Sequence, residues 1–383
     1  MRYRIEVLSP VHVGSGEVLT RFDYVWEDGW LYVLSLERIL EHPKVRAEEL
    51  AALMERGDFD WGDYLRGRGI KPPDVARYRA RCARDPAGVL RRGDVREHIK
   101  DPRFRPYIPG SSIKGAIRTA LLRVALKYNK ALLQKAKEAV ERRLKEVERR
   151  LAGRKERQQR SIIRREKGWF AQRMERTFFG KDSNYDLMRA VRVGDTTPFE
   201  AGLEVDLVTT YDLKGDGRLE AREDLRIFAE LLPVGVAAEV RLTFDKKLFD
   251  YPELGLKGKE VYVDDMPKLC NAWAFELAQR EEEFLRKGGM REAADFYRDL
   301  RGKIRSLPEG AFIVPLGWGP GWEAKTVGER IREADEELFA RLRGIFKLGS
   351  EGVEVFPKTR RLVGGTYPLG WVFLTPATPG DMG

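Results

Sequence analysis

The segment 107–122 contains residue types suited to binding an anion. A Pro-Gly turn is followed by Ser111 and Ser112, either of which would cap the helix that the next apolar residues predict. The free N–H groups at a helix start, together with the helix dipole, attract phosphates. Lys114 and Arg118 are four residues apart and would place two cations on one side of that helix. A capped surface helix with two solvated cations explains the local pattern equally well, so both interpretations stay open here.

A glycine-rich run occupies residues 316–326, with Gly317, Gly319 and Gly321 at alternate positions and Lys325 after them. The run does not match a P-loop, because alanine stands where the second glycine is needed before the Lys-Thr pair. Glycines still let backbone N–H groups approach a phosphate chain closely, and the lysine adds positive charge. The run therefore predicts phosphate contact without nucleotide hydrolysis.

Aromatic and cationic residues gather in the last part of the chain. Trp318 and Trp322 lie within the glycine-rich run, where each would either stack on a base or pack in the core. Lys358, Arg360 and Arg361 form a compact cation cluster further on. The cluster would contact RNA or another subunit, or it would pair with acidic neighbours on the surface.

Candidates for catalysis and metal binding are few. The histidines are His12, His42 and His98, and none has the spacing to Asp, Glu or Cys that a metal site needs. His12 precedes the glycine loop 14–16 and is the one candidate for acid–base chemistry on RNA, although a structural role after a strand explains it better. Asp23 is the least implausible carboxylate, but it falls in an expected strand. We therefore expect no catalytic residue and no metal site.

Three passages in the chain carry a family resemblance. Residues 108–118, Ile-Pro-Gly-Ser-Ser-Ile-Lys-Gly-Ala-Ile-Arg, resemble the signature of the RAMP superfamily, the RNA-binding proteins of CRISPR systems. Residues 10–17 and the glycine-rich run 316–326 resemble the same superfamily. Within it, the run 356–363 followed by 368–372 is similar to the family of fifth Csm subunits, which close the 3′ end of the guide RNA in type III-A effector complexes.

The resemblance implies an α+β protein with a ferredoxin-like, RRM-related RAMP fold and large helical insertions. It also implies a non-catalytic, RNA-binding subunit without a cofactor, which binds the 3′ part of the guide crRNA and ends the backbone filament. Such a subunit supports crRNA maturation and antiviral defence. Its partners would be the guide crRNA, target RNA and other Csm subunits, above all the backbone RAMP subunit.

The expected RNA contacts follow from these motifs. They are Gly14, Ser15, Gly16, Ser111, Ser112, Lys114, Arg118, Gly317, Gly319, Gly321, Lys325, Lys358, Arg360 and Arg361. We expect the two glycine loops and the helix start to converge on one face and to neutralise phosphates with little sequence readout. Two alternatives stay open: a RAMP endoribonuclease that processes precursor crRNA with a base such as His12, and a RAMP subunit of a type III-B complex.

Charge is concentrated in one segment. The chain has 383 residues and a formal net charge of +10 with a pI near 9.4, which favours polyanionic partners. Residues 127–167 contain sixteen Lys or Arg and six Glu, so this segment alone accounts for the whole excess. It lacks proline and has one glycine, which predicts a long helix or a helical hairpin that projects from the core. A basic arm along nucleic acid and a solvated helix with internal ion pairs both fit.

Composition indicates a protein of the cytoplasm. Cys82 and Cys270 are the only cysteines, which suits a reducing compartment. No apolar run approaches the roughly 20 residues that span a bilayer, so no membrane contact is expected.

The elements that position these motifs alternate without a βαβ rhythm. Residues 2–8 alternate as a strand does, and Asp28-Gly29 predicts a hairpin turn. We predict two parts. Residues 1–245 would form an N-terminal ferredoxin-like RAMP domain with the basic insertion at about 127–167, and residues 246–383 a C-terminal helical and ferredoxin-like part carrying the glycine-rich run.

Overall fold

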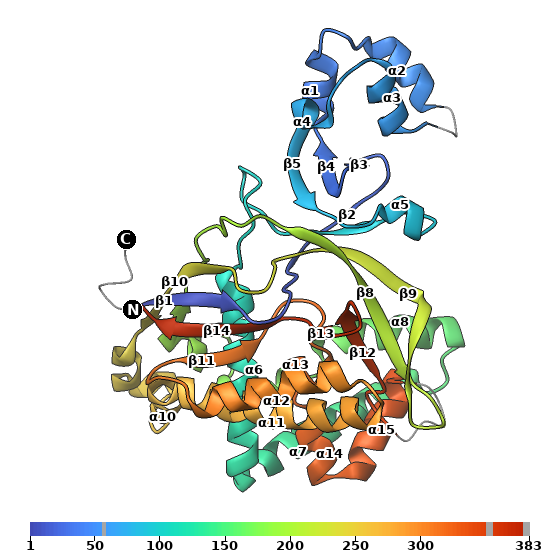
Figure 1. Ribbon diagram of the computed structural model, residues 1–383. Helices are drawn as coiled ribbons and strands as arrows, with labels where there is room; N and C mark the ends of the chain where they lie inside the picture. The colour runs from blue at the N-terminus through green and yellow to red at the C-terminus, as the bar shows by residue number, and fades with distance from the viewer. Residues whose placement is uncertain (56–58, 350–354, 378–383) are drawn as a thin grey trace.

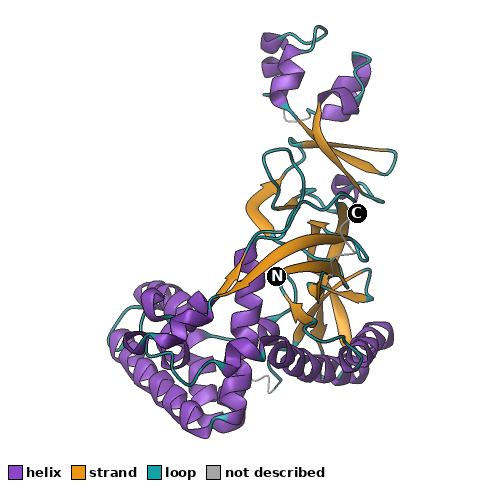
Figure 2. Cartoon of the chain, turned by 90° about the vertical axis from the view of Figure 1, so that its left-hand side faces the viewer, coloured by secondary structure: helices purple, strands orange, loops and turns teal. Residues whose placement is uncertain are grey.

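The computed structural model describes residues 1–55, 59–349 and 355–377. Strands and helices are mixed along the chain, as the element order shows. Two curved sheets lie between a small helical head at one end and a layer of helices at the other (Figures 1 and 2). The predicted α+β class is confirmed.

The first sheet contains one ferredoxin-like unit. Its elements in chain order are β1 (Arg2–Val7), α6 (Gly110–Tyr128), β7 (Val191–Val193), β10 (Ala237–Phe244), α11 (Met266–Lys287) and β14 (Trp371–Pro376). Neighbouring strands pair antiparallel in the order β14-β1-β10-β7, the arrangement of a β-α-β-β-α-β ferredoxin-like unit. One further strand, β11 (Phe312–Pro315), pairs with β14 and extends the sheet. The unit therefore begins with the first strand and closes with the last strand of the described residues.

The first strand forms because its residues alternate. Tyr3, Ile5 and Val7 are buried, while Arg2 and Arg4 are exposed, as the alternating pattern predicts. Below this sheet, α6 and α11 pack against each other, and α11 contacts β11 (Figure 1). The first sheet and these two helices share one large hydrophobic core.

The second sheet rises above the first. Its strands are β2 (Gly14–Leu19), β6 (Val95–His98), β9 (Leu219–Leu231), β8 (Glu204–Leu213), β5 (Ala76–Arg81), β4 (Trp30–Leu34) and β3 (Tyr24–Glu27), in that order. β12 (Thr359–Val363) pairs with β8 and with the short β13 (Tyr367–Pro368). β8 and β9 form a long hairpin that curves over the molecule (Figure 1). This sheet therefore joins residues from both ends of the chain.

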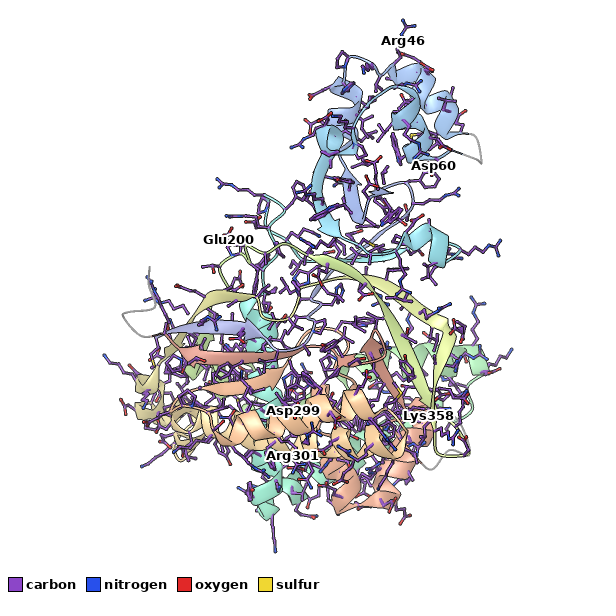
Figure 3. The ribbon with its side chains drawn as sticks, viewed as in Figure 1. Arg46, Asp60, Glu200, Asp299, Arg301 and Lys358 are labelled. Carbon is purple, nitrogen blue, oxygen red and sulfur yellow. The ribbon has the colours of Figure 1, made fainter. Side chains whose placement is uncertain are left out.

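A helical head caps the β3–β5 end of the second sheet. It contains α1 (Leu36–Glu41), α2 (Ala47–Met54), α3 (Trp61–Gly67) and α4 (Pro72–Val75). The head has a small core of its own around Ile39, Leu50 and Trp61, and Figure 3 shows Arg46 and Asp60 on its surface. Asp28 and Gly29 have positive φ angles of 49° and 79° between β3 and β4, so the predicted hairpin turn is confirmed.

The remaining helices form the layer opposite the head. They are α7 (Lys130–Leu151), α8 (Glu156–Trp169), α9 (Gln172–Phe179), α12 (Arg291–Arg305), α13 (Trp322–Lys325), α14 (Gly328–Ala334) and α15 (Glu336–Phe346). Shorter pieces are α5 (Pro86–Val89), α10 (Val261–Asp264) and the 3₁₀ turns η1 (Ser183–Tyr185), η2 (Leu187–Ala190), η3 (Lys246–Asp250) and η4 (Pro252–Leu254). The large helical insertions that the resemblance implies are present.

The basic segment 127–167 folds as a helical hairpin, but it does not project freely. α7 buries Val140, Leu144 and Val147 because its apolar residues recur every three or four positions, and it packs against α9 and α15. α8 is held to α7 by the buried Glu166, which pairs with Arg143 at 2.5 Å and with Arg150 at 2.7 Å. The expectation of a projecting arm was wrong for α7, since its apolar stripe requires a partner surface.

The predicted division near residue 245 stays a prediction. The first sheet takes β1, β7 and β10 from before that position and β11 and β14 from after it. Helices α11 and α12 and the glycine-rich run all follow it, as the sequence indicates.

Candidate nucleic-acid interface

Three sequence motifs meet at one groove between α6, the start of β2 and the glycine-rich run. The groove has a volume of about 370 Å³. We call it the central groove, and its lining residues are Val13, Gly14, Ser111, Ser112, Gly115, Ala116, Thr119, Pro315, Leu316, Gly317, Trp318, Ala324 and Lys325. Gly14, the two serines, Gly317 and Lys325 are among the predicted contacts, and the most distant of them lie more than three hundred residues apart in the chain.

Helix α6 contributes the serine side of the central groove. The helix begins at Gly110 with Pro109 as its N-cap, and no side chain caps it. The expectation that Ser111 or Ser112 caps the helix was therefore wrong: both lie within the first turn. The backbone N–H of Gly110 instead donates to Asp195 Oδ1 at 2.8 Å, so a carboxylate of the protein already occupies part of the helix start. What remains for a ligand is the side of the first turns, where the serine hydroxyls line the groove.

The glycine-rich run is fixed against the first strand segment. The backbone N–H of Trp318 donates to the carbonyl of His12 at 2.7 Å. A Cβ atom on Gly317 would lie 2.3 Å from the same carbonyl oxygen, so only glycine fits there. Gly319 packs against Leu369, while Gly321 has no neighbour within 4 Å of a Cβ position. The run is therefore closely packed at Gly317 and Gly319 and has open space at Gly321.

Arg123 positions the segment that carries Lys325. This buried arginine of α6 donates from Nη1 to the carbonyl oxygens of Glu323 at 2.9 Å and Thr326 at 2.6 Å. Its guanidinium also lies 3.7 Å from the centroid of the Trp273 ring. Burial lowers the pKa of Arg123 to about 9, with the nearby Arg330 and Arg280 adding to the effect. The two carbonyl bonds hold α13 against α6, so Lys325 is placed at the rim of the central groove.

Two arginines flank Trp318 beside the central groove. The guanidinium of Arg96 lies 4.6 Å from the ring centroid, and that of Arg361 lies 5.0 Å from it. Within the described residues neither guanidinium forms an ion pair with a carboxylate. Burial lowers the pKa of Arg361, and the adjacent Arg96 lowers it further. Their unneutralised charge would be stabilised by a polyanion.

Arg96 was missed in the sequence because its own segment looks unremarkable. It lies on β6 opposite Val18 of β2, and that register brings it beside the groove. Its strand, β6, has only four residues, too few for an alternating pattern to show which face its side chain takes. The pairing of β2 with β6 is a contact between distant segments, which local spacing does not reveal.

Gly14, Ser15 and Gly16 form the start of β2, so the prediction of a loop there was wrong, and only Gly14 lines the central groove. Gly14 lines it, whereas Ser15 is exposed and donates its hydroxyl to Glu97 Oε2 at 2.9 Å. Gly16 has a φ of 103° and open space around it. These first residues of β2 are therefore exposed, but the serine hydroxyl already has an acceptor.

Four predicted cations lie away from the central groove. Arg118 pairs with Asp186 at 2.7 Å and Glu175 at 3.4 Å, and Lys114, on the same side of α6, has a pKa lowered by burial. Lys358 and Arg360 are also paired with carboxylates. Lys358 lies 3.2 Å from Asp212, near the end of the β8–β9 hairpin in Figure 3, and Arg360 lies 2.5 Å from Glu281. The structure does not bring these four into the groove.

A buried polar cluster centred on Glu230 lies next to the central groove. Glu230 accepts hydrogen bonds from Lys100 Nζ at 2.6 Å, from the Tyr78 hydroxyl at 2.8 Å and from the backbone N–H of His98 at 2.8 Å. His12 Nδ1 lies 2.8 Å from the Glu230 carbonyl oxygen, so that nitrogen donates. Burial lowers the pKa of His12, and it lowers the pKa of His98 to about 3. Both rings are therefore neutral at physiological pH.

The two candidates for catalysis have structural partners. His12 is 2% exposed and packs edge-on against Trp318. Asp23 Oδ2 accepts from the backbone N–H of Thr20 at 2.7 Å and from its hydroxyl at 2.8 Å, which fixes the turn before β3. Over the ranges that the structure describes, no group of three or more His, Cys, Asp or Glu is placed to hold a metal ion. Nor is any helix there long and apolar enough to cross a membrane.

A family model decides the relationship that the motifs indicate. The model of the RAMP superfamily matches residues 4–351. The chain belongs to the RAMP superfamily. The resemblance read from the three motifs is thereby confirmed, and the ferredoxin-like unit with its inserted helices is this RAMP protein's version of the fold.

Relatives of this RAMP protein carry one name. CRISPR system Cms protein Csm5 of Methanocaldococcus jannaschii is 23% identical, over 98% of this chain and 88% of the relative. The protein of the same name from Streptococcus thermophilus is 24% identical, over 67% of this chain and 68% of the relative. The similarity to the family of fifth Csm subunits is therefore confirmed by name.

Solved structures agree in fold. One chain of a Csm–crRNA–target RNA ternary complex of a type III-A CRISPR-Cas system superimposes with a TM-score of 0.73 at 27% identity, covering 98% of this chain and all of that one. The crystal structure of Csm5 from T. onnurineus gives a TM-score of 0.64 at 24% identity, over 96% and 99% of the two chains. The second likeness concerns the fold alone.

Proposed function

We propose that this RAMP protein is a non-catalytic, RNA-binding subunit of a type III-A CRISPR effector complex. It binds the 3′ part of the guide crRNA and ends the filament of backbone RAMP subunits. In this role it contacts the guide crRNA, neighbouring Csm subunits and target RNA, and it supports crRNA maturation and antiviral defence in the cytoplasm. The proposal draws on the relatives named Csm5 and on the likeness to a chain of a complex that contains crRNA and target RNA.

The convergence at the central groove is the observation that carries this proposal. Gly14, Ser112 and Gly317 come from three distant motifs, and all of them line one groove. Lys325 at its rim, with Arg96 and Arg361 beside Trp318, supplies positive charge. Small residues leave room for a sugar-phosphate chain, and the hydroxyl and N–H groups donate to phosphate oxygens. A surface of this kind binds RNA through its backbone and reads little sequence.

The absence of catalysis in this proposal is supported by the partners of the two candidate residues. His12 holds its Nδ1 against the Glu230 carbonyl and lies almost fully buried. The Asp23 carboxylate accepts two hydrogen bonds within its own turn. Each side chain has a structural role that accounts for its position.

The test is nuclease protection of the guide RNA in the assembled complex. Complexes are prepared with this chain, without it, and with the variant Arg96→Gln/Lys325→Gln/Arg361→Gln. We expect omission and the triple variant both to expose the 3′ end of the guide while the 5′ end stays protected. A control is Lys257→Gln/Lys287→Gln, which removes two exposed lysines that do not line the groove. Loss of protection at the 5′ end, or unchanged protection on omission, would overturn the proposed position.

Native mass spectrometry of the same complexes tests the role at the filament end. One copy of this chain for several copies of the backbone subunit is the expected ratio. A ratio that grows with the number of backbone subunits would instead identify this chain as a repeating member.

A further inference from the structure

A mainly apolar pocket lies next to the central groove, between α6, α7, α9 and the segment α13–α15. Its volume is about 340 Å³. Leu122, Met174, Trp322 and Phe346 are among the residues that form its walls. Pockets that hold single small ligands have volumes of about 300–1,000 Å³, so this apolar pocket is large enough for one planar group such as a nucleobase.

The apolar pocket continues the central groove along one face of α6. Ser111, Gly115 and Thr119 line the groove, and Thr119 and Leu122, one turn further, line the pocket. Lys325 borders both spaces. The two spaces therefore adjoin at Thr119 and Lys325, where a chain lying in the groove would pass the pocket.

The walls and rim of the apolar pocket differ in chemistry. Aromatic rings contribute strongly to the walls, and Phe170 and Phe346 meet edge to face with centroids 4.7 Å apart. Lys325 and Lys167 stand at the rim, and within the described residues neither ammonium group has an ion-pair partner. The Thr119 hydroxyl donates to the Gly115 carbonyl at 3.0 Å, so its lone pairs are free to accept. An apolar ring with polar edges and an adjacent negative charge matches this combination.

We propose that the apolar pocket takes one base of the bound RNA, turned out of the strand, while the phosphate next to it contacts Lys325. The inference rests on the proposed function, because the strand would arrive through the central groove. A base stacks on aromatic side chains through its faces and meets hydroxyl groups at its edge. An apolar side chain of a neighbouring subunit would also fit the pocket, but it would leave Lys167 and Lys325 at the rim without an anion.

A fluorescent base scan tests this inference with the full-length chain. Guide RNAs carry 2-aminopurine at one position each, and the fluorescence of every RNA is measured when bound. At one position we expect quenching of several-fold beyond that of its neighbours. An abasic nucleotide at the same position should weaken binding by roughly 5- to 100-fold, the range that loss of one stacked base gives.

Ala171 offers a way to close the apolar pocket from its mouth. Its side chain lines the pocket yet is exposed, so Ala171→Trp fills the entrance without changing the core. Gln172→Trp, at the exposed neighbouring position outside the pocket lining, is the matched control. The first variant should lose the quenching and the sensitivity to the abasic site while it still binds RNA through the groove. The second should behave as the parent.

Crosslinking to an added thiol tests the same inference without the tryptophan substitution. Cys82 and Cys270 are both buried, so Ala171→Cys adds an accessible thiol at the pocket mouth. A guide RNA with a thiol-reactive base should crosslink to it from one position, the one that is quenched, and Gln172→Cys should crosslink without that preference.

The outcomes separate the two proposals. If RNA binds but no position is quenched, or if Ala171→Trp leaves the quenching unchanged, the base-pocket inference is wrong and the proposed function stands. If the chain and its complex bind no guide RNA, the proposed function itself fails. If adding a neighbouring Csm subunit without RNA blocks labelling of Ala171→Cys, the pocket holds a protein side chain and the inference is likewise wrong.

Discussion

Lys100 Nζ lies 2.6 Å from Glu230 Oε2 in a site where the two side chains are 4% and 0% exposed. The ammonium group also lies 3.2 Å from Glu97 and donates to the carbonyl of His98 at 2.8 Å, so each of its protons has an acceptor. Glu230 belongs to β9 and Lys100 lies two residues after the end of β6, and these two strands pair in parallel. The pair therefore joins β9 to the segment after β6. His12, which bonds to the carbonyl of Glu230, lies next to this contact.

Breaking this buried pair should destabilise the protein strongly. Lys100→Met leaves an uncompensated buried carboxylate, for which we expect a loss of about 3–5 kcal/mol in the free energy of unfolding. The matched control is Lys246→Met, which breaks an exposed pair with Asp264 and should cost less than about 1 kcal/mol. Urea titrations measure both. A loss at Lys100 no larger than at Lys246 would show that the cluster tolerates an unpaired carboxylate.

The buried His98 predicts a loss of stability in mild acid. Its pKa is about 3 in the folded protein, because burial disfavours the charged ring, and about 6.5 in an unfolded chain. As the pH falls below 6.5 the unfolded chain binds a proton that the folded protein does not, so stability decreases. The contribution is at most about 1.4 kcal/mol per pH unit.

The comparison of His98→Gln with the parent isolates this effect. The variant should be less stable at pH 7, since Gln cannot reproduce both ring hydrogen bonds, yet its stability should decline less steeply between pH 6.5 and pH 5. Urea titrations at each pH provide the measurement. Parallel pH profiles for the two proteins would mean that His98 does not titrate as its environment indicates.

The sequence predicts the elements of this fold better than their assembly. Alternation in β1 and the Asp28-Gly29 turn are local signals, and both were confirmed because adjacent residues generate them. The place of β14 between β1 and β11 depends on contacts between the two ends of the chain, and no local pattern encodes it. The packing of α7 was not predicted either, because the many charged residues around its apolar positions indicated an exposed helix.

In the candidate site, too, local features were predicted from the sequence better than contacts between distant residues. Gly14, Ser111, Ser112 and Gly317 line the groove as predicted from their motifs, whereas Ser15, Gly16, Gly319 and Gly321 do not. The cations were harder to assign, since a lysine or arginine contacts RNA only if no carboxylate of the protein holds it. Arg118 is held by Asp186 and Arg360 by Glu281, whereas Arg96, which has no ion-pair partner in the described part of the chain, was not predicted.

Salt dependence should distinguish the groove cations from the paired ones. For single strands the slope of log affinity against log salt is about −0.7 per neutralised phosphate. Arg96→Gln/Lys325→Gln/Arg361→Gln should therefore make the slope about 2 less negative and weaken all RNA sequences alike. Fluorescence anisotropy at several salt concentrations provides the measurement.

Lys114→Gln/Arg118→Gln is the informative comparison for this series. Because Arg118 already pairs with two carboxylates, we expect the slope to change by less than about 0.7, the value for one neutralised phosphate. A larger change would mean that RNA displaces those carboxylates. An effect confined to one RNA sequence would point to base readout in place of phosphate contact.

The purified protein should not cleave guide or target RNA, with or without a divalent metal. His12 is the residue to vary, because its Nε2 lies near Gly14 at the groove. His12→Ala should leave the RNA products of the assembled complex unchanged, and gel analysis of end-labelled RNA is the measurement. Specific cleavage by the parent that disappears in this variant would instead identify a RAMP endoribonuclease.

The basic hairpin α7–α8 calls for a charge-reversal experiment. Arg142 and Lys145 are exposed and pair within α7, with Glu138 at 3.7 Å and with Glu141 at 2.9 Å, and Arg149 is exposed nearby. Arg142→Glu/Lys145→Glu/Arg149→Glu replaces two weak attractions with repulsions of similar size. Each is worth about 0.3–0.5 kcal/mol, so we expect stability to fall by roughly 1–2 kcal/mol.

Retention of guide RNA in the complex is the decisive measurement for this variant. If the hairpin lies along RNA, reversal of three charges should lower retention well beyond what the small stability loss explains. The control is Arg143→Glu, which breaks the buried contact with Glu166 that holds α8 to α7. Its main effect should be a lower thermal stability. A triple variant that assembles and retains RNA like the parent would show that the exposed charges of α7 are solvated and that its buried face is what the fold requires.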